Sequence, residues 1–256
     1  MSNGVHKAKR GNTVPTSQTR LIRLVARLGS PAVARAPTDF AARLGRLFDL
    51  SDTIVLDDAT RRTAHQPPAP ARQRYQARQQ LAADLADSRD ALAQAIAEAF
   101  ESDAVSEPLP PPQAARKPGI PPAFEPYARF YQARQRLLTA RVQRLRARAR
   151  AIVSEADPAL VPLAELDAVF DNTLTAYRRQ CHEALPAVLE KRFRALWRAH
   201  HRALPAETPD PPAEWLREGA WLDRFQQEMR LLLLAELEAR LIPVQGLLDA
   251  LTVQQG

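Results

Sequence analysis

The chain has 256 residues, a formal net charge of +7 and a hydrophobic content of 45%. This length allows one large or two small domains, and a charged fraction of 25% is typical of a globular rather than a disordered protein. A single cysteine, Cys181, excludes an intramolecular disulfide, and no apolar run approaches the roughly 20 residues of a membrane-spanning helix. Because Arg23 and Arg27 interrupt the first apolar segment, that segment does not match a secretory signal core. We therefore expect a soluble, cytoplasmic protein.

Proline clusters and apolar periodicity divide the chain into six parts. In chain order these are a disordered basic tail, short N-terminal helices, a linker, a long helix with an acidic face, a proline-rich linker and a C-terminal helical bundle: residues 1–16, 17–57, 58–72, 73–103, 104–122 and 123–252. Thr38 can cap one of the short helices. The apolar triplet 54–56 is the one place where a strand is conceivable, but it is too short to predict one.

The segment 73–103 has helical periodicity. Its apolar stripe consists of Leu81, Leu85, Leu92, Ile96 and Phe100. Acidic residues lie on the other side: Asp84, Asp87, Asp90, Glu98 and Glu101. The prolines that follow favour an extended, semi-rigid connection.

The stretch 126–154 organises the rest of the chain. It contains eight arginines and no acidic residue, so its charge of +8 accounts for the whole net charge of +7. Apolar residues recur every seven positions with two more beside them, which predicts the stripe of an amphipathic helix. These stripe residues are Tyr131, Leu138, Leu145, Ile152, Val142 and Ala149.

The remaining periodic segments also predict helices. An apolar face over 163–185 includes Phe170, Tyr177 and Cys181; Pro186 then bends or restarts the helix, and Pro243 should kink the last one. Five residues of the last helix should be buried against Phe170, Tyr177 or the stripe of 126–154: Trp221, Phe225, Met229, Leu233 and Leu237. Candidates for packing or self-association, which would make a homo-oligomer, are Trp221, Phe225, Met229, Leu231 and Leu234. The sequence thus predicts an all-α protein, an elongated bundle of long amphipathic helices with proline-rich connectors.

Four segments resemble a known family: TRLIRLVARL, TDFAARLGRLFDLSDTI, FEPYARFYQARQ and WLDRFQQEMRLLLLAELEARLIPVQGLLDAL. They are similar to the uncharacterised proteobacterial family catalogued as domain of unknown function 3348, over residues 17–57 and 124–252. The family has no assigned activity. Its members tend to be encoded beside envelope proteins with peptidoglycan-binding ends, so the resemblance implies a cytoplasmic accessory role.

Reactive groups do not form a recognisable catalytic or metal-binding pattern. The glycines are isolated, which disfavours a nucleotide-binding loop. The adjacent pairs Cys181–His182 and His200–His201 point about 100° apart on a helix, so neither pair suits one metal ion. We expect Cys181 to be a small core residue and the histidines to lie on the surface or at helix ends. We predict no catalytic residue, metal or cofactor, and no enzyme activity.

One pair of carboxylates has a spacing that acid–base chemistry can use. Asp167 and Asp171 are four residues apart and share a helical face. Because Arg178 and Arg179 follow closely, we expect these aspartates to be solvated instead.

The arginines of the basic helix form the candidate interaction face: Arg134, Arg136, Arg141, Arg144, Arg146, Arg148 and Arg150. We expect Glu165, Asp167, Asp171, Glu236 and Glu238 to neutralise part of it. Most acids of 73–103 lie opposite the apolar stripe of that helix, so packing of stripe against stripe should not bring them to Arg144. We expect an acidic protein partner to take the rest, and the family resemblance implies that this partner is envelope-associated.

Two other readings of the arginines stay open. Non-specific nucleic-acid binding through 126–154 is the alternative, although no aromatic residues are interleaved on the basic face. Attachment to anionic lipid is weaker, because the apolar stripe is narrow. Arginine in place of lysine also follows from GC-rich coding, which requires no function at all.

Overall fold

The computed structural model describes residues 20–29, 67–101, 108–113, 119–205 and 208–252. Throughout these ranges the chain is helical or irregular and contains no strand, so the predicted all-α class is confirmed there. The expectations for the tail 1–16, for a helix capped by Thr38 and for the triplet 54–56 lie outside the described residues.

The helices follow the apolar periodicity closely. The short 3-10 helices are η3 (Pro158–Leu160) and η4 (Pro212–Leu216). The α-helices are α1 (Arg20–Gly29), α4 (Ala71–Glu101), α5 (Glu125–Ala156), α6 (Val161–Thr173), α7 (Thr175–Glu183), α8 (Leu185–Ala203) and α9 (Trp221–Ala250).

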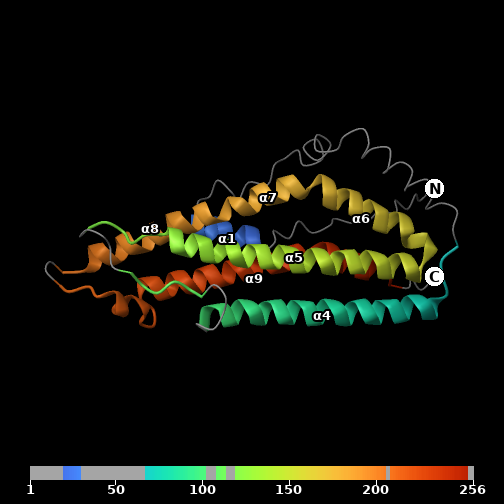
Figure 1. Ribbon diagram of the computed structural model, residues 1–256, viewed down its shortest axis with the longest axis horizontal. Helices are drawn as coiled ribbons and strands as arrows, with labels where there is room; N and C mark the ends of the chain where they lie inside the picture. The colour runs from blue at the N-terminus through green and yellow to red at the C-terminus, as the bar shows by residue number, and fades with distance from the viewer. Residues whose placement is uncertain (1–19, 30–66, 102–107, 114–118, 206–207, 253–256) are drawn as a thin grey trace, which may run out of the picture.

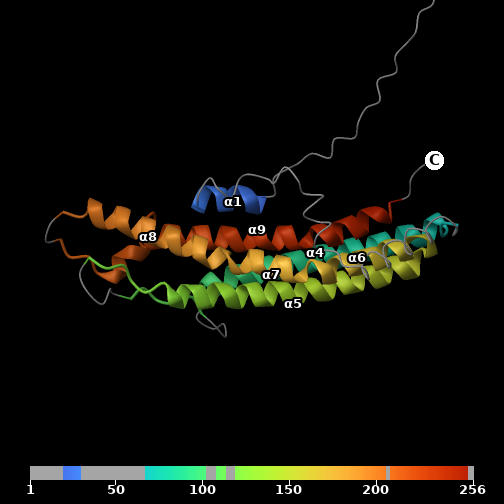
Figure 2. The same cartoon turned by 90° about the horizontal axis from the view of Figure 1, so that it is seen from above.

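The three longest helices run side by side along the long axis of the molecule (Figures 1 and 2). Helices α4, α5 and α9 all contact one another, and α6, α7 and α8 return along α5 in sequence. Helix α1 packs across α8 and α9. This arrangement leaves α4 and α5 as neighbours at one side of the bundle.

Prolines start several of these helices, as expected from the missing backbone N–H. Pro126, Pro162 and Pro186 each stand in the first turn of their helix, so the predicted restart at Pro186 is confirmed. Pro243 lies inside α9.

Asp157 ends α5 and fixes the adjoining segments. Its backbone is extended, and its side chain accepts hydrogen bonds of 3.0 Å from the amides of Ala159 and Ala69. The first bond caps η3, whereas the second holds the start of α4 against the end of α5. With the residue only 1% exposed, these bonds satisfy a buried carboxylate and set the register of the two helices.

The core extends through the bundle as one cluster. The stripe of α5 is buried except for Ile152, which is half-buried. Aromatic rings fill one end, where Phe193 lies 5.1 Å from Phe225 and 5.2 Å from Trp221 between ring centroids. Such edge-to-face pairs add about 0.5–1.5 kcal/mol each beyond the burial of area.

The inward face of α9 is confirmed. Trp221, Phe225, Met229, Leu233 and Leu237 are all buried. The predicted burial of Tyr177 is wrong, since it is 51% exposed. Helix α7, which carries Tyr177, has no buried residue and mainly contacts its neighbours α6 and α8.

Candidate interaction site

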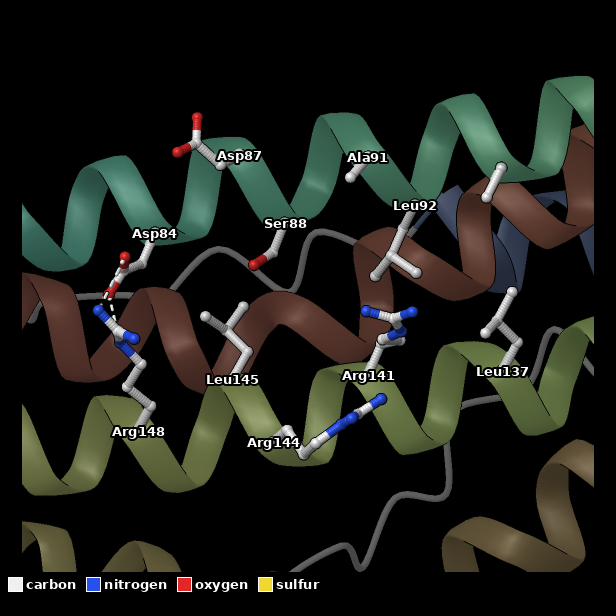
Figure 3. Close-up of a pocket in the computed structure, with 11 residues that line it drawn as sticks. Asp84, Asp87, Ser88, Ala91, Leu92, Leu137, Arg141, Arg144, Leu145 and Arg148 are labelled. Carbon is white, nitrogen blue, oxygen red and sulfur yellow. Dashed lines mark hydrogen bonds and ion pairs between the residues drawn. The ribbon is translucent and has the colours of Figure 1, made fainter.

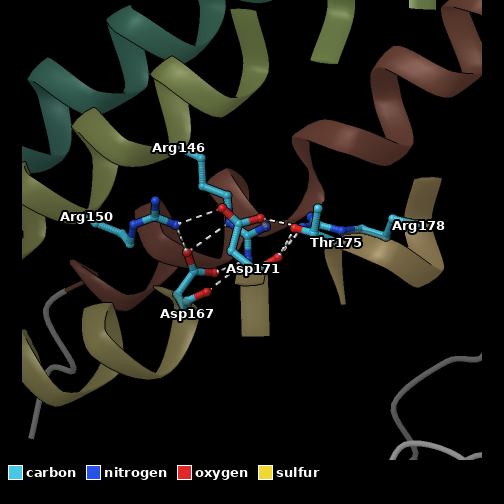
Figure 4. A network of polar contacts seen from close by, with 6 residues as sticks. All are labelled: Arg146, Arg150, Asp167, Asp171, Thr175 and Arg178. Carbon is cyan, nitrogen blue, oxygen red and sulfur yellow. Dashed lines mark hydrogen bonds and ion pairs between the residues drawn. The ribbon is translucent and has the colours of Figure 1, made fainter. Parts of the chain in front are cut away.

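Two arginines of α5 form ion pairs with aspartates of the same chain (Figure 4). Arg146 is 6% exposed at its side chain and binds Asp167 at 2.6 Å and Asp171 at 2.6 Å. Arg150 reaches the same two carboxylates at 3.0 and 3.3 Å. Arg178 of α7 also binds Asp171. This network fastens α6 to α5, so Arg146 and Arg150 do not belong to an exposed face.

The same network corrects the expectation that Asp167 and Asp171 are solvated, because each side chain is 13% exposed. Burial raises the pKa of Asp171, but the hydrogen bond from Arg178 and the charges of Arg146 and Arg178 outweigh it. The pKa is therefore lowered from its ordinary value of 3.8. Asp171 is therefore ionised, and the two aspartates form ion pairs with arginine rather than an acid–base pair.

Two further arginines contact other side chains, Arg134 within α5 and Arg148 across to α4. Arg134 is buried, and its guanidinium carbon lies 5.3 Å from the centroid of the Phe130 ring. Arg148 donates to Asp84 of α4 at 2.7 and 3.3 Å. No described acid of α4 forms an ion pair with Arg144, as expected, but the contact of Asp84 with Arg148 was not predicted. Asp84 flanks the α4 stripe, and close packing of α4 against α5 brings its carboxylate to Arg148.

The other three candidates, Arg136, Arg141 and Arg144, are exposed. Among the described residues no carboxylate lies within ion-pair distance of Arg141 or Arg144. Arg144 donates only to the backbone oxygen of Ala140, one turn earlier in its own helix, at 3.3 Å. These two guanidiniums therefore keep their charge available to solvent.

Arg141 and Arg144 border a groove of about 540 Å³ between α4 and α5 (Figure 3). Arg141 points toward Leu92 of α4, whereas Arg148 turns to Asp84 at one end of the groove. The lining residues are Asp84, Asp87, Ser88, Ala91, Leu92, Ala95, Leu137, Arg141, Arg144, Leu145 and Arg148. The groove thus combines an apolar floor with a cationic rim on the α5 side.

The candidates on α9 separate into two groups. Trp221, Phe225 and Met229 are buried inside the chain and are not available to a second copy. Leu231 is 41% exposed, and Leu234 is half-buried against the core. Among these five candidates, only the two leucines present apolar surface to solvent.

A buried polar cluster around Glu236 was not predicted. Glu236 is 0% exposed and accepts hydrogen bonds from Tyr131 and from Gln135, the latter at 3.1 Å. His182 Nδ1 and Arg240 Nη1 lie 2.9 and 2.6 Å from its carboxylate. The sequence offered one signal, since Glu236 falls among the buried leucines of α9.

This cluster joins α5, α7 and α9. Burial raises the pKa of Glu236, but the contacts with His182, Arg240 and Tyr131 outweigh it, so the pKa is lowered from 4.5. Burial and the nearby Glu236 charge raise the pKa of Tyr131 well above its ordinary value. An ionised Glu236 held by neutral and cationic donors links the helices internally, because its side chain is 0% exposed.

The sulfur and imidazole groups are scattered. Cys181 is exposed, so its expected place in the core is wrong, for the same reason as Tyr177. His200 contacts Asp210 at 3.0 Å near the end of α8, and His201 stacks on Trp197 with centroids 5.0 Å apart. No group of three or more His, Cys, Asp or Glu side chains suited to a metal ion occurs within the described ranges.

Comparison with known proteins places the chain in one family. None of the helices described is long and apolar enough to cross a membrane. Neither the curated proteins nor the solved structures gave a match. The family model described as protein of unknown function DUF3348 matches residues 7–253, nearly the whole chain. The chain therefore belongs to the DUF3348 family.

Proposed function

We propose that this protein is a non-enzymatic helical interaction protein, a scaffold that holds an acidic protein partner at the exposed arginines of α5. The proposal includes a cytoplasmic location and an envelope-associated partner. Those two points rest on the gene neighbourhood that the family resemblance implies.

One observation carries the proposal. The fold pairs Arg146, Arg148 and Arg150 with its own aspartates, yet Arg141 and Arg144 meet no carboxylate among the described residues. An exposed guanidinium is a strong donor for planar, two-point recognition of carboxylates. Charge left available beside an apolar groove is typical of a binding surface.

The internal ion pairs weaken the nucleic-acid reading. Three of the arginines that would contribute to a basic helical face hold the bundle together instead. Non-specific binding depends on how many phosphates a protein neutralises, so fewer exposed arginines reduce the affinity. Carboxylates of α4 at the same groove repel phosphate further.

Co-purification from the native host tests the proposal. The double variant R141E/R144E should lose the partner that the wild-type protein retains. The matched control is R179E/R194E, which reverses two exposed arginines that pair with Glu183 and Glu190 in their own helices. Both variants change the net charge equally, so a loss confined to R141E/R144E assigns binding to the groove rim.

Gel shifts with random duplex DNA at low and high salt form the second arm. We expect no salt-sensitive DNA binding that depends on Arg141 and Arg144. DNA binding that R141E/R144E abolishes, or a partner retained equally by both double variants, would overturn the proposal.

A further inference from the structure

The groove residues of α5 follow one line of the helix. Arg141, Arg144 and Arg148 are spaced i, i+3 and i+7, so they lie on one side of α5. The ion pair between Arg148 and Asp84 closes one end of the groove at 2.7 Å. Arg141 and Arg144 remain as two cationic positions one turn apart along the open part.

The α4 side of the groove has the same spacing with small residues. Ser88, Ala91 and Ala95 are also i, i+3 and i+7 and line the groove opposite the arginines. Small side chains let another backbone approach closely, whereas Leu92 and Leu145 supply a buried apolar floor. The two sides therefore differ in chemistry: the α4 side presents small residues together with Asp84 and Asp87, and the α5 side is cationic.

We propose that this groove binds one amphipathic helix of a partner protein, with the carboxylates of that helix facing α5. This inference rests on the proposed function and specifies the partner segment. Residues 137–148 of α5 span about 16 Å at about 1.5 Å per residue, which corresponds to about three helical turns of the partner. Carboxylates spaced i, i+3 or i, i+4 on that helix would meet Arg141 and Arg144 together.

The charges at the groove favour such a helix over nucleic acid. Asp87 is exposed on the α4 side, and Asp84 lies at the end in its ion pair with Arg148, so both carboxylates line the same groove as the arginines. A phosphate backbone carries charge at every unit and would meet these carboxylates. An amphipathic helix can place acids toward α5 and neutral residues toward α4.

Fluorescence anisotropy with designed peptides tests this inference. The probes are three labelled peptides of about 15 residues with the same leucine–alanine face. Their α5-facing edge carries glutamate, glutamine or lysine, and a random DNA duplex is the fourth probe. The wild-type protein should bind the glutamate peptide at least about tenfold more tightly than the glutamine peptide, and the lysine peptide least.

Two variants separate charge from shape. R141Q/R144Q should weaken binding of the glutamate peptide at least about tenfold, whereas R179Q/R194Q should not change it. Ala91→Phe leaves the arginines intact but fills the groove, so it should also abolish binding. Circular dichroism confirms that each variant retains the helical fold, as expected for exposed positions.

The inference is overturned if glutamate and glutamine peptides bind alike, if Ala91→Phe binds like the wild type, or if DNA binds more tightly than the glutamate peptide. Its failure differs from failure of the proposed function. A natural partner that R141E/R144E releases, combined with no peptide preference, leaves the function standing and removes only the helical, acidic description of the partner segment.

Discussion

Glu236 lies in an unusual environment for a glutamate, because its side chain is completely buried. A carboxylate with no exposed surface is stable only because Tyr131, Gln135, His182 and Arg240 surround it. The side chain of Arg240 is 9% exposed, so it depends on Glu236 in return. The contacts of Glu236 with Tyr131, Gln135 and His182 therefore fix how α5, α7 and α9 meet.

Replacing Glu236 with Gln should lower the free energy of unfolding by about 3 kcal/mol, because Arg240 keeps its charge without a buried counterion. Urea denaturation measures the change. The control is Glu238→Gln on the same helix, which removes only a surface pair with Arg20 at 49% exposure and should cost less than about 1 kcal/mol. Equal losses for both variants would contradict the assigned role of Glu236.

The pH dependence of stability follows from the same residue and from Asp171. Both have a pKa below the ordinary values of 4.5 and 3.8, so the unfolded chain binds more protons as the pH falls. Their stabilisation is complete above those ordinary values and is lost as the pH drops through the lowered ones. Urea midpoints measured from neutral pH downward should fall below about pH 4.5, and less steeply for Glu236→Gln. If the urea midpoint of Glu236→Gln fell with pH as steeply as that of the wild type, Glu236 would not be a source of the pH dependence.

At the scale of elements, ion pairs between side chains provide much of the contact between α6 and α5. Only Pro162 and Ala164 are buried in α6, whereas Arg146 and Arg150 of α5 hold its two aspartates. Such an attachment is strong only while the aspartates balance the charge of the arginines, because an unpaired buried arginine lowers the free energy of unfolding by about 3–5 kcal/mol. The position of α6 therefore depends on a few polar contacts rather than on a broad apolar face.

The double variant D167N/D171N should reduce hydrogen-exchange protection more in α6 than in α9, because Arg146 loses both carboxylates. Exchange followed by mass spectrometry compares the two helices in one sample. Glu183→Gln with Glu190→Gln is the matched control, since those acids pair on the surface. Uniform loss of protection throughout the chain would show that the network does not act locally.

At the scale of the whole molecule, one continuous core connects the helices. Leu145 belongs to it at 6% exposure, on the face of α5 that meets α4. Its place in the core makes it a test of whether the helices of the bundle unfold together.

Leu145→Asp should destabilise the protein by about 4 kcal/mol or more and unfold the bundle, because it places a charge in the apolar contact. Circular dichroism during thermal unfolding checks both helicity and midpoint. Gln143→Asp, an exposed change two residues earlier, should cost less than about 1 kcal/mol. Unchanged helicity and melting of Leu145→Asp would contradict this packing.

The sequence by itself determined the helical class, the limits of the long helices and the inward faces of α5 and α9. Apolar spacing of three and four residues is a local property, and burial of those stripes dominates the energetics. The same reasoning failed for Tyr177 and Cys181, because α7 has the periodicity of a packed helix but few helices around it.

Only the tertiary structure decided what each charge does. Arg144 and Arg146 are two residues apart, yet one is exposed and the other is buried between two aspartates. Glu236 and Glu238 differ in the same way. A charge is governed by which residues distant in sequence approach within a few ångströms and exclude water, and no local pattern encodes that distance.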